Sequence, residues 1–422
     1  MSYLLKYTGD KVVGRIQLPA SKSESNRLLI IHALCNDNFT IKNISESNDT
    51  KSLQEALQLI KAKSANVVDV GDAGTSFRFL TALLSITEGT WFLKGSSRMH
   101  QRPIKPLVEA LKQIGADIEY LESVGFPPLK IIGKKLEGGT VNITGAISSQ
   151  FISALLLIAP ALKDGLSITI NEGIVSESYF KMTTEMMNLF GVRVQRKENT
   201  LVVNSGKYRT HLLDRDENNI SFYTVESDWS AASYWYSVAA LCKECTLTLV
   251  GLKKDSWQGD AAVASIYRHF GVHTIYELQE IVLQKHMSDT NLVEFDFINC
   301  PDLAQTVSVT AAFTTNSFLL NGLQTLRNKE TDRLTALKNE LIKLNVNVGI
   351  IDNSLRIDSR KPEIAELVSI HVYDDHRMAM SFAVLVFVMG SIRIENPEVV
   401  KKSYPNFWID LRSVGVEIIP NE

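Results

Sequence analysis

A basic, hydroxyl-rich stretch, Leu18 to Arg27, is followed at once by an apolar run over residues 28–34. Its proline and serines predict a loop that leads into a helix, with Ser23 or Ser25 as the N-cap. Lys22 and Arg27 then stand beside a helix N-terminus, where free N–H groups and the helix dipole favour an anion. The stretch therefore indicates a site for an anionic group, although by itself it also fits a solvated turn.

Further polar stretches have the same character, and each lies where a helix is expected to begin. Gly71 to Arg78 combines two glycines, which let backbone N–H groups approach a ligand, with the hydroxyls of Thr75 and Ser76. The other stretches cover residues 97–103, 148–150, 176–179, 327–334, 374–380 and 400–405. Each of them alone also fits an ordinary turn. Residues 374–380 fit it least well, because their charges run directly into an apolar helix, where an unpaired charge is costly.

The cations of these stretches all lie at expected strand-to-helix junctions, and both halves of the chain contribute them. They are Lys22, Arg27, Arg78, Arg102, Lys329, Arg333, Arg377 and Lys402. Helices whose N-termini face one cleft would build a positive field there. With Asp302, Glu330 and His376 nearby as candidates for proton transfer, this set indicates an enzyme that acts on phosphorylated or carboxylated small molecules.

Two alternating patterns predict the elements that must position these groups. In the first, a helix that is apolar nearly all round runs through a short turn into a strand; its copies cover residues 28–41, 79–93, 154–170, 232–249, 307–320 and 378–394. In the second, the helix is amphipathic; its copies cover residues 53–70, 107–118, 182–194, 262–275, 334–350 and 407–419. Six copies of each predict six α/β units, three per domain, with the first class of helix buried. Glycines at 115, 191, 271 and 415 suit helix C-caps with positive φ.

Composition bounds the class of protein. The 422 residues suffice for at least two domains, and the net charge of −3 argues against a nucleic-acid partner. The longest apolar runs, residues 151–162 and 378–389, are shorter than the ~20 residues of a membrane-spanning helix, and no secretory signal is visible, so we expect no membrane partner and a cytoplasmic location. Cys242 and Cys245 have the spacing of a metal or redox pair, but no second pair accompanies them, so a plain turn is expected.

Six motifs, in this order and spacing, make the chain resemble the 5-enolpyruvylshikimate-3-phosphate synthase family from Leu18 to about Pro405. They are Lys22-Ser23-x-Ser25-x-Arg27, Ala73-Gly74-Thr75-x-x-Arg78, Arg102-Pro103, Ser148-Ser149-Gln150, Lys329-Glu330-Thr331-Asp332-Arg333 and Asp375-His376-Arg377-Met378-Ala379-Met380. Any one of them is unspecific, but six in order are very specific.

The resemblance implies a fold and a reaction. The fold is an α/β, two-domain inverted α/β barrel, in which each domain has three repeats with buried helices and an outer sheet layer, and the active site lies in the interdomain cleft. One domain would comprise residues 1–20 plus 229–422 and the other residues 21–228. The reaction transfers the enolpyruvyl group of phosphoenolpyruvate to the 5-hydroxyl of shikimate 3-phosphate through a tetrahedral intermediate and releases phosphate. The resemblance further implies that no metal or organic cofactor is needed and that glyphosate occupies the phosphoenolpyruvate site, and we expect the chain to be a monomer.

The resemblance also implies roles for single residues. The shikimate 3-phosphate site would comprise Lys22, Ser23, Arg27, Ser148, Ser149, Gln150, Ser176, Tyr179, Asp302 and Lys329. The phosphoenolpyruvate site would comprise Lys22, Gly74, Arg102, Gln150, Arg333, Arg377 and Lys402. Arginine forks suit a ligand that carries both a carboxylate and a phosphate. Asp302 would take the proton of the attacking hydroxyl, and Glu330 with Lys22 would protonate the methylene carbon.

Two residues depart from the family pattern. Asp72 stands where the family usually has Asn, and Thr325 stands where many members have a longer Asn or Glu, so a direct ligand contact is in doubt at both positions. Phe79, beside the same loop as Asp72, is also unusual.

Two other functions compete with this interpretation. The first is the related transferase that acts on UDP-N-acetylglucosamine, but that family has Asn after the first-loop Lys and a reactive Cys before its Arg-Pro. Here Ser23 follows Lys22, and residues 97–101 contain no Cys. The second is a non-catalytic anion-binding relative, against which Lys22, Asp302 and Glu330 speak together, because a binder needs neither carboxylate.

Overall fold

The chain forms two compact units in the computed structural model, which describes residues 1–421 apart from 145–147, 172–174, 287–293, 315 and 359–366. Unit 1 comprises Met1–Ala20 and Glu226–Glu422, and unit 2 comprises Ser21–Val225. The sequence-based division assigned residues 226–228 to the second domain, whereas in the structure they lie in unit 1. Ser227 forms an antiparallel bridge with Ala20, and the backbone N–H of Asp228 donates to the carbonyl of Pro19 at 2.8 Å.

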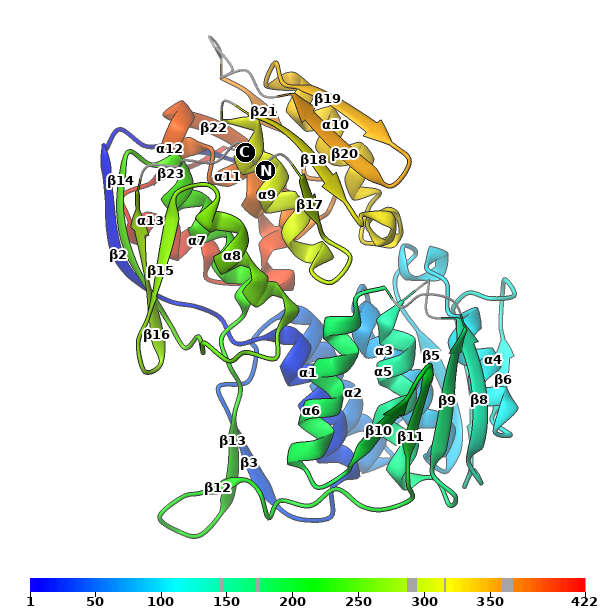
Figure 1. Cartoon of the computed structure of the whole chain (residues 1–422). Helices are drawn as coiled ribbons and strands as arrows, with labels where there is room; N and C mark the ends of the chain where they lie inside the picture. The colour runs from blue at the N-terminus through cyan, green and yellow to red at the C-terminus, as the bar shows by residue number, and fades with distance from the viewer. Residues whose placement is uncertain (145–147, 172–174, 287–293, 315, 359–366, 422) are drawn as a thin grey trace. The chain divides into compact units, whose positions relative to one another are not determined.

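The described residues of unit 2 form three sheets and the helices that pack against them (Figure 1). The sheet orders are β4-β5-β7-β6, β10-β11-β9-β8 and β12-β13-β3. The strands are β3 Phe39–Lys42, β4 Val67–Asp69, β5 Gly89–Lys94, β6 Asp117–Tyr120, β7 Leu129–Gly133, β8 Gly139–Thr144, β9 Leu166–Asn171, β10 Val194–Lys197, β11 Thr200–Val203, β12 Asp214–Arg215 and β13 Ser221–Thr224. The helices are α1 Lys22–Leu34, α2 Asn48–Ala62, α3 Gly74–Ile86, α4 Lys105–Gln113, α5 Ser149–Ile158 and α6 Glu177–Leu189.

Unit 1 is built in the same way, with the four-stranded sheets β21-β22-β1-β23, β15-β16-β14-β2 and β17-β18-β20-β19. The strands are β1 Ser2–Lys6, β2 Lys11–Gln17, β14 Glu244–Val250, β15 Val272–Tyr276, β16 Glu280–Lys285, β17 Glu294–Asp296, β18 Ser317–Asn321, β19 Asn347–Ile351, β20 Ser354–Asp358, β21 Ser369–Ile370, β22 Ser391–Glu395 and β23 Glu417–Asn421. The helices are α7 Trp229–Leu241, α8 Val263–Arg268, α9 Ala304–Ala312, α10 Arg333–Lys343, α11 His376–Ala383, α12 Val386–Met389 and α13 Phe407–Ser413.

Within the part of the chain that the structure describes, each of the six sheets contains one parallel pair of strands. The pairs are β4·β5, β8·β9, β3·β13, β2·β14, β17·β18 and β21·β22. Parallel neighbours need a crossover connection, and a helix of the apolar class provides it, as α3 does between β4 and β5. Two pairs have partners that are distant in the sequence: all of unit 2 lies between β2 and β14, and most of unit 2 lies between β3 and β13.

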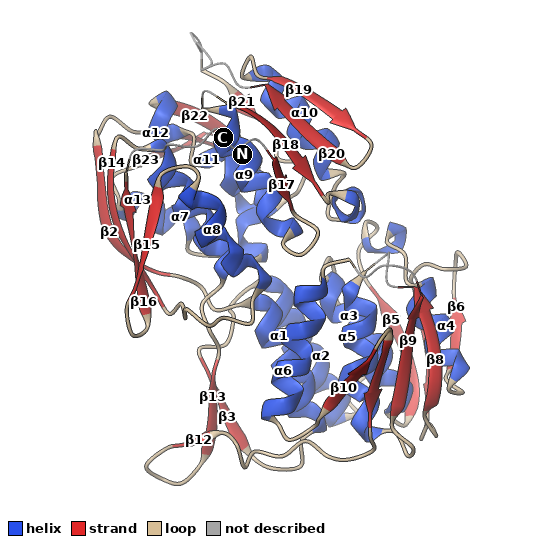
Figure 2. Cartoon of the chain, viewed as in Figure 1, coloured by secondary structure: helices blue, strands red, loops and turns tan. Residues whose placement is uncertain are grey.

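The two helix classes expected from the sequence are confirmed. Every residue of α5 except Gln150 is buried, whereas α4 buries only Leu107, Val108, Ala110 and Leu111. Figure 2 shows helices α1, α2, α3, α5 and α6 gathered in unit 2, with strands along their flank. The four predicted C-cap glycines all have positive φ, between 77° and 98°. Among the described residues, no helix combines the length and the apolar character that a membrane crossing requires.

Candidate functional site

The first turns of four helices meet at one end of unit 2. Lys22 Nζ of α1 lies 3.3 Å from Asp49 Oδ2 of α2, and Ser76 Oγ of α3 donates to the Asp49 carbonyl at 3.0 Å. Gln150 Nε2 of α5 donates to Thr75 Oγ1 of α3 at 3.2 Å. The N–H groups at these helix starts therefore add to the positive potential of the nearby cations.

Helix α1 begins two to four residues earlier than the sequence predicted. Its N-cap is Ser21, whose hydroxyl accepts from the Glu24 N–H, so the expectation of Ser23 or Ser25 at this position is wrong. Ser23 and Arg27 consequently lie inside the helix. The Ser25 hydroxyl instead accepts from the Ser45 N–H at 3.0 Å, which holds the loop after β3 against α1.

Arg27 is 1% exposed and joins three helices. Its Nε donates to Thr183 Oγ1 at 2.7 Å, and its Nη2 donates to the Tyr179 carbonyl at 3.0 Å, both on α6. Nη2 also donates to Ser153 Oγ of α5 at 3.3 Å, and Nη1 to the Ser23 carbonyl at 2.7 Å. Burial lowers the pKa of Arg27 to about 10, so the guanidinium remains charged at neutral pH. Arg27 thus fixes the start of α6 beside α1 and α5.

The start of α3 is shaped around an arginine. A Cβ added to Gly74 would lie 2.5 Å from Arg102 Nη1, so a larger residue at this position would force the guanidinium to move. Arg102 is 8% exposed, and its Nε has no hydrogen-bond partner among the described residues. Arg78 Nη1 donates to the Gly74 carbonyl at 3.1 Å, and Arg78 Nη2 to the Pro103 carbonyl at 3.1 Å. Arg78 therefore ties the loop that carries Arg102 to α3.

The remaining predicted residues of unit 2 lie at the starts of α5 and α6. Ser148 is the N-cap of α5 and accepts from the Gln150 N–H at 3.3 Å, with Ser149 next to it. Ser176 precedes α6 with φ 58° and ψ 46°, a left-handed conformation that non-glycine residues rarely adopt and that clusters at functional sites. Asp72, the departure noted above, accepts from Ser96 Oγ and so orders the loop before Arg102.

Unit 1 contains a second cluster, in which three carboxylates alternate with four cations. Arg333, 1% exposed at the start of α10, is its centre. Its Nε lies 2.7 Å from Asp375 Oδ2, Nη1 3.0 Å from Asp302 Oδ1, and Nη2 2.8 Å from Glu330 Oε2. Burial opposes the charge of Arg333, but Asp375, Glu330 and Asp302 raise its pKa above the ordinary value.

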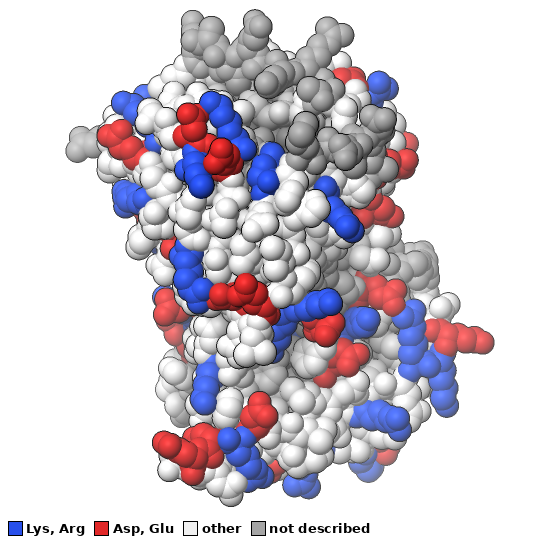
Figure 3. Space-filling model, turned by 60° about the vertical axis from the view of Figure 1, so that its left-hand side comes forward, with Lys and Arg blue, Asp and Glu red and all other residues white. Residues whose placement is uncertain are grey.

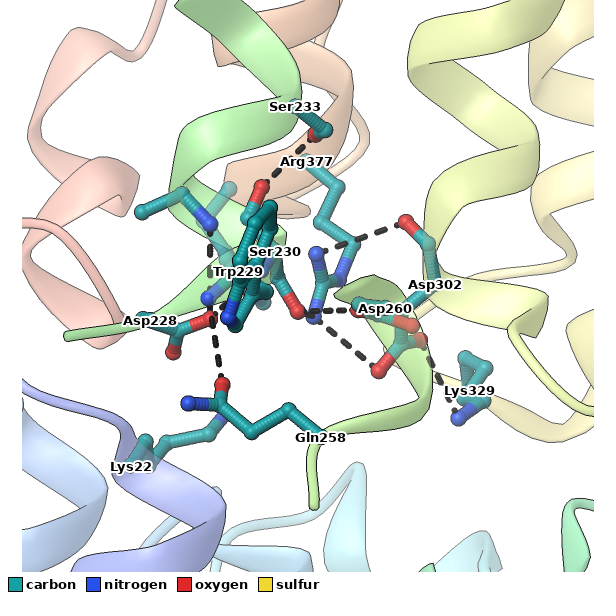
Figure 4. Close-up of polar contacts among 12 residues, drawn as sticks. Lys22, Asp228, Trp229, Ser230, Ser233, Gln258, Asp260, Asp302, Lys329 and Arg377 are labelled. Carbon is teal, nitrogen blue, oxygen red and sulfur yellow. Dashed lines mark hydrogen bonds and ion pairs between the residues drawn. The ribbon is translucent and has the colours of Figure 1, made fainter. Parts of the chain in front are cut away.

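The other three cations of this cluster contact Asp302 or Glu330. Asp302 lies 3.3 Å from Lys329 Nζ through Oδ1 and 3.0 Å from Arg377 Nη2 through Oδ2 (Figure 4). Lys402 Nζ lies 3.3 Å from Glu330 Oε1. Burial lowers the pKa of Lys329, against the opposite effect of Asp302. Both carboxylates therefore lie in direct contact with cations on more than one side.

Helix starts position this second cluster as well. Asp375 caps α11 by accepting from the Arg377 N–H at 2.8 Å, and the same carboxylate binds Arg333. Arg377 Nη2 donates to Ser230 Oγ, in the first turn of α7, at 3.3 Å. The ring of His376, a predicted proton-transfer candidate, is 1% exposed, with Nδ1 3.9 Å from Asp375 Oδ1.

Sequence reasoning missed Asp375 as a member of the cluster, and it missed Ser230 and Asp260, which lie next to the cluster. Asp375 stood in a recognised motif but was not assigned a role, and Asp260 follows Gln258-Gly259 at a helix start, a signal like that of the other stretches. Thr325 Oγ1 is buried and has no hydrogen-bond partner among the described residues. On the face drawn in Figure 3, Lys and Arg are interspersed with Asp and Glu, so the described part of that face has no patch made of cations alone. The cations discussed above gather at the helix starts instead.

Comparisons with known proteins agree on one family. A family model described as EPSP synthase (3-phosphoshikimate 1-carboxyvinyltransferase) matches residues 6–67 and 57–411. A 3-phosphoshikimate 1-carboxyvinyltransferase of Bacteroides fragilis (strain YCH46) is 43% identical over 99% of both chains. One of Colwellia psychrerythraea (strain 34H / ATCC BAA-681) is 35% identical over 96% of this chain and 97% of its own.

Solved structures show the same fold. The structure of an EPSP synthase from Acinetobacter baumannii superimposes with a TM-score of 0.78 and 21% identity, and the match covers 100% of both chains. The mixed α/β architecture expected from the sequence is thereby confirmed.

Proposed function

This chain belongs to the EPSP synthase family, and from that premise we propose that it transfers the enolpyruvyl group of phosphoenolpyruvate to the 5-hydroxyl of shikimate 3-phosphate. One observation carries the proposal: two carboxylates, Asp302 and Glu330, are held by separate nitrogens of Arg333 within a set of four cations. A site that only bound anions would need the cations but neither carboxylate, whereas a transfer that moves protons needs both.

The residues of unit 1 suit the groups of phosphoenolpyruvate. We assign Arg333, Arg377 and Lys402 to its carboxylate and phosphate, and Lys329 to shikimate 3-phosphate. An incoming anion has to compete with Glu330 for Lys402 and Arg333. A carboxylate that loses these cations binds a proton more readily, so substrate binding itself would prepare Glu330 to act as an acid.

The residues of unit 2 suit anionic groups in a different way. We assign Gly74 and Arg102 to phosphoenolpyruvate, because Arg102 has an unpartnered buried Nε beside the start of α3. Lys22 and Gln150 contact both substrates. We assign the remaining predicted residues to shikimate 3-phosphate: Ser23, Arg27, Ser148, Ser149, Ser176 and Tyr179.

The proposed chemistry proceeds in two stages. Asp302 takes the proton of the 5-hydroxyl as that oxygen bonds to C2 of phosphoenolpyruvate, while Glu330, with Lys22, gives a proton to the methylene carbon. The tetrahedral adduct then loses phosphate as the same carbon gives up a proton and the double bond forms again. The cations stabilise the charge on the adduct and on the departing phosphate.

Phosphate release measured with both substrates, and then with each alone, tests this function. Turnover is expected only when phosphoenolpyruvate and shikimate 3-phosphate are both present. Turnover with UDP-N-acetylglucosamine in place of shikimate 3-phosphate would assign the chain to the related transferase, and tight binding of both ligands without turnover would assign it to a non-catalytic relative. We also propose that the protein is a cytoplasmic monomer, and light scattering of the purified chain tests the monomeric state.

A further inference from the structure

A buried carboxyl group that has no assigned role lies next to the unit 1 cluster. Asp260 sits in the short 3-10 helix Gly259–Ala262 that leads into α8, and it is 3% exposed. Its Oδ2 accepts a hydrogen bond from Ser230 Oγ. Its Oδ1 is buried and has no hydrogen-bond partner among the described residues. A fully ionised carboxylate is costly in such surroundings, whereas a neutral carboxyl is tolerated.

Asp260 is connected to Asp302 through two residues (Figure 4). The Ser230 hydroxyl that donates to Asp260 also accepts from Arg377 Nη2 at 3.3 Å. The same Nη2 lies 3.0 Å from Asp302 Oδ2. Ser230 itself is held through its backbone, because its N–H donates to Asp228 Oδ1 at 2.7 Å and its carbonyl accepts from Ser233 Oγ at 2.6 Å. The hydroxyl of Ser230 is therefore a fixed link between the two carboxyl groups.

The surroundings of Asp260, taken together, oppose its ionisation. Burial, and next the carboxylate of Asp302, raise the pKa of Asp260 from 3.8 to about 7, while Arg377 and the Ser230 hydrogen bond act in the opposite direction. The carboxylate of Asp228 and the thiol of Cys300 are its other titratable neighbours. With Asp260 neutral, the four cations of the cluster face three carboxylates: Asp302, Glu330 and Asp375. Ionisation of Asp260 adds a fourth negative charge beside Arg377.

We propose that Asp260 is a positioning residue for enolpyruvyl transfer, which acts in its neutral form through Ser230 to hold Arg377 and, through Arg377, Asp302. This inference rests on the proposed function and adds a residue to it. The neutral acid keeps Ser230 in place without adding a negative charge where anionic substrate binds. Ionisation of Asp260 weakens the binding of phosphoenolpyruvate, because the added charge competes for Arg377.

The pH dependence of phosphoenolpyruvate binding tests the proposal. KM for phosphoenolpyruvate and kcat are measured from pH 5.5 to 9 for the wild type, Asp260→Asn, Asp260→Ala and Ser230→Ala. Glu340→Gln is the matched control, since Glu340 is a buried carboxylate of the same unit that contacts Lys343 and Tyr373 instead. Asn resembles the neutral acid in shape and charge and does not titrate.

In Asp260→Asn, KM at pH 6 is expected to stay near that of the wild type, and its rise above pH 7 is expected to become shallower. Asp260→Ala and Ser230→Ala are expected to raise KM about tenfold or more, the factor for a lost hydrogen bond in a charged network. Glu340→Gln is expected to keep the wild-type profile. A wild-type profile in Asp260→Asn overturns the proposal. If Asp260→Asn does not fold, an unchanged KM in Ser230→Ala overturns it.

Stability provides an independent measurement of the charge state. The unfolded chain loses the Asp260 proton near pH 3.8, whereas the folded protein keeps it to about pH 7, so Asp260 makes the wild type less stable as pH rises through this interval. Asp260→Asn should therefore gain stability relative to the wild type between about pH 4 and pH 7. No relative gain would show that Asp260 is not held neutral. A wild type without turnover would instead refute the proposed function, whatever the stability of the variants.

Discussion

The guanidinium of Arg333 sets the distance between the two carboxylates that we assign to proton transfer. Its Nη1 and Nη2 hold Asp302 and Glu330 separately, and its Nε holds Asp375. A planar fork can hold several carboxylates in fixed directions, whereas the single ammonium of a lysine cannot. A carboxylate fixed in this way needs little reorganisation when it takes or gives a proton.

Replacing either Asp302 or Glu330 by Ala should lower kcat by about 10²–10⁴-fold, as expected for the loss of a general acid or base, with a much smaller effect on KM. Steady-state phosphate release measures both constants. Glu417→Ala, which removes an exposed carboxylate from β23 of the same unit, should leave both unchanged. A Glu330→Ala protein that turns over within a few-fold of the wild type would show that its assigned role is wrong.

Arg27 should contribute to stability as well as to substrate binding, because four of its hydrogen bonds are made within the protein. Arg27→Lys cannot reach all of these acceptors, so the free energy of unfolding should fall by about 1–3 kcal/mol. Urea denaturation measures the change, and the exposed Arg193→Lys is the control. Equal stability of the two variants would show that Arg27 does not hold α5 and α6 to α1.

At the scale of elements, the first turns of the helices position the polar residues of both units: those at the helix starts of unit 2 and those of the cluster around Arg333 in unit 1. The start of α3 illustrates how: Arg78 binds the Gly74 carbonyl and the loop before α4, and this loop places Arg102 against Gly74. The loop and the helix start therefore form one anion-binding element, in which glycine makes room for a cation.

Gly74→Ala should raise the inhibition constant of glyphosate more than the KM of phosphoenolpyruvate. The added Cβ displaces the Arg102 guanidinium, and the longer ligand tolerates the lost space less well. Competitive inhibition assays measure both constants. Gly206→Ala, where a Cβ would meet nothing within 4 Å, is the control in the same unit. Equal proportional changes in the two constants would show that Gly74 does not discriminate between the ligands.

At the scale of the whole molecule, the path of the chain means that two of the described sheets of unit 1 are complete only with the N-terminal segment Met1–Ala20. Strand β1 lies between β22 and β23. Strand β2 pairs with β14, as Figure 1 shows, so both N-terminal strands complete sheets formed by residues far along the chain. The three sheets of unit 2, in contrast, are formed within Ser21–Val225.

A fragment of residues 21–225 should therefore fold alone, whereas a fragment of residues 226–422 should not. Without β1, the edges of β22 and β23 lose their common partner and expose unpaired backbone groups. Circular dichroism and thermal unfolding of both fragments measure this difference. Cooperative unfolding of the 226–422 fragment would contradict the expected dependence on β1 and β2.

The sequence by itself determined the class and order of the elements and the family. Periodicity distinguished the wholly apolar helices, such as α5, from the amphipathic ones, such as α4. A helix buried on all sides needs apolar residues at nearly every position, whereas a helix buried on one side needs them only at every third or fourth position. The caps at Gly115 and Gly415 were predictable for a similar reason, since a left-handed backbone selects glycine.

The tertiary structure decided which charged side chains contact other protein groups and which keep donors that a ligand can use. No local pattern distinguishes Arg27, whose donors bind protein groups on three helices, from Arg102, whose Nε has no partner among the described residues. The link from Asp260 through Ser230 and Arg377 to Asp302 joins residues up to 147 positions apart, as the contact of Arg377 with Ser230 shows. Such contacts depend on how helices pack, and packing is decided by the whole chain rather than by the residues at the site.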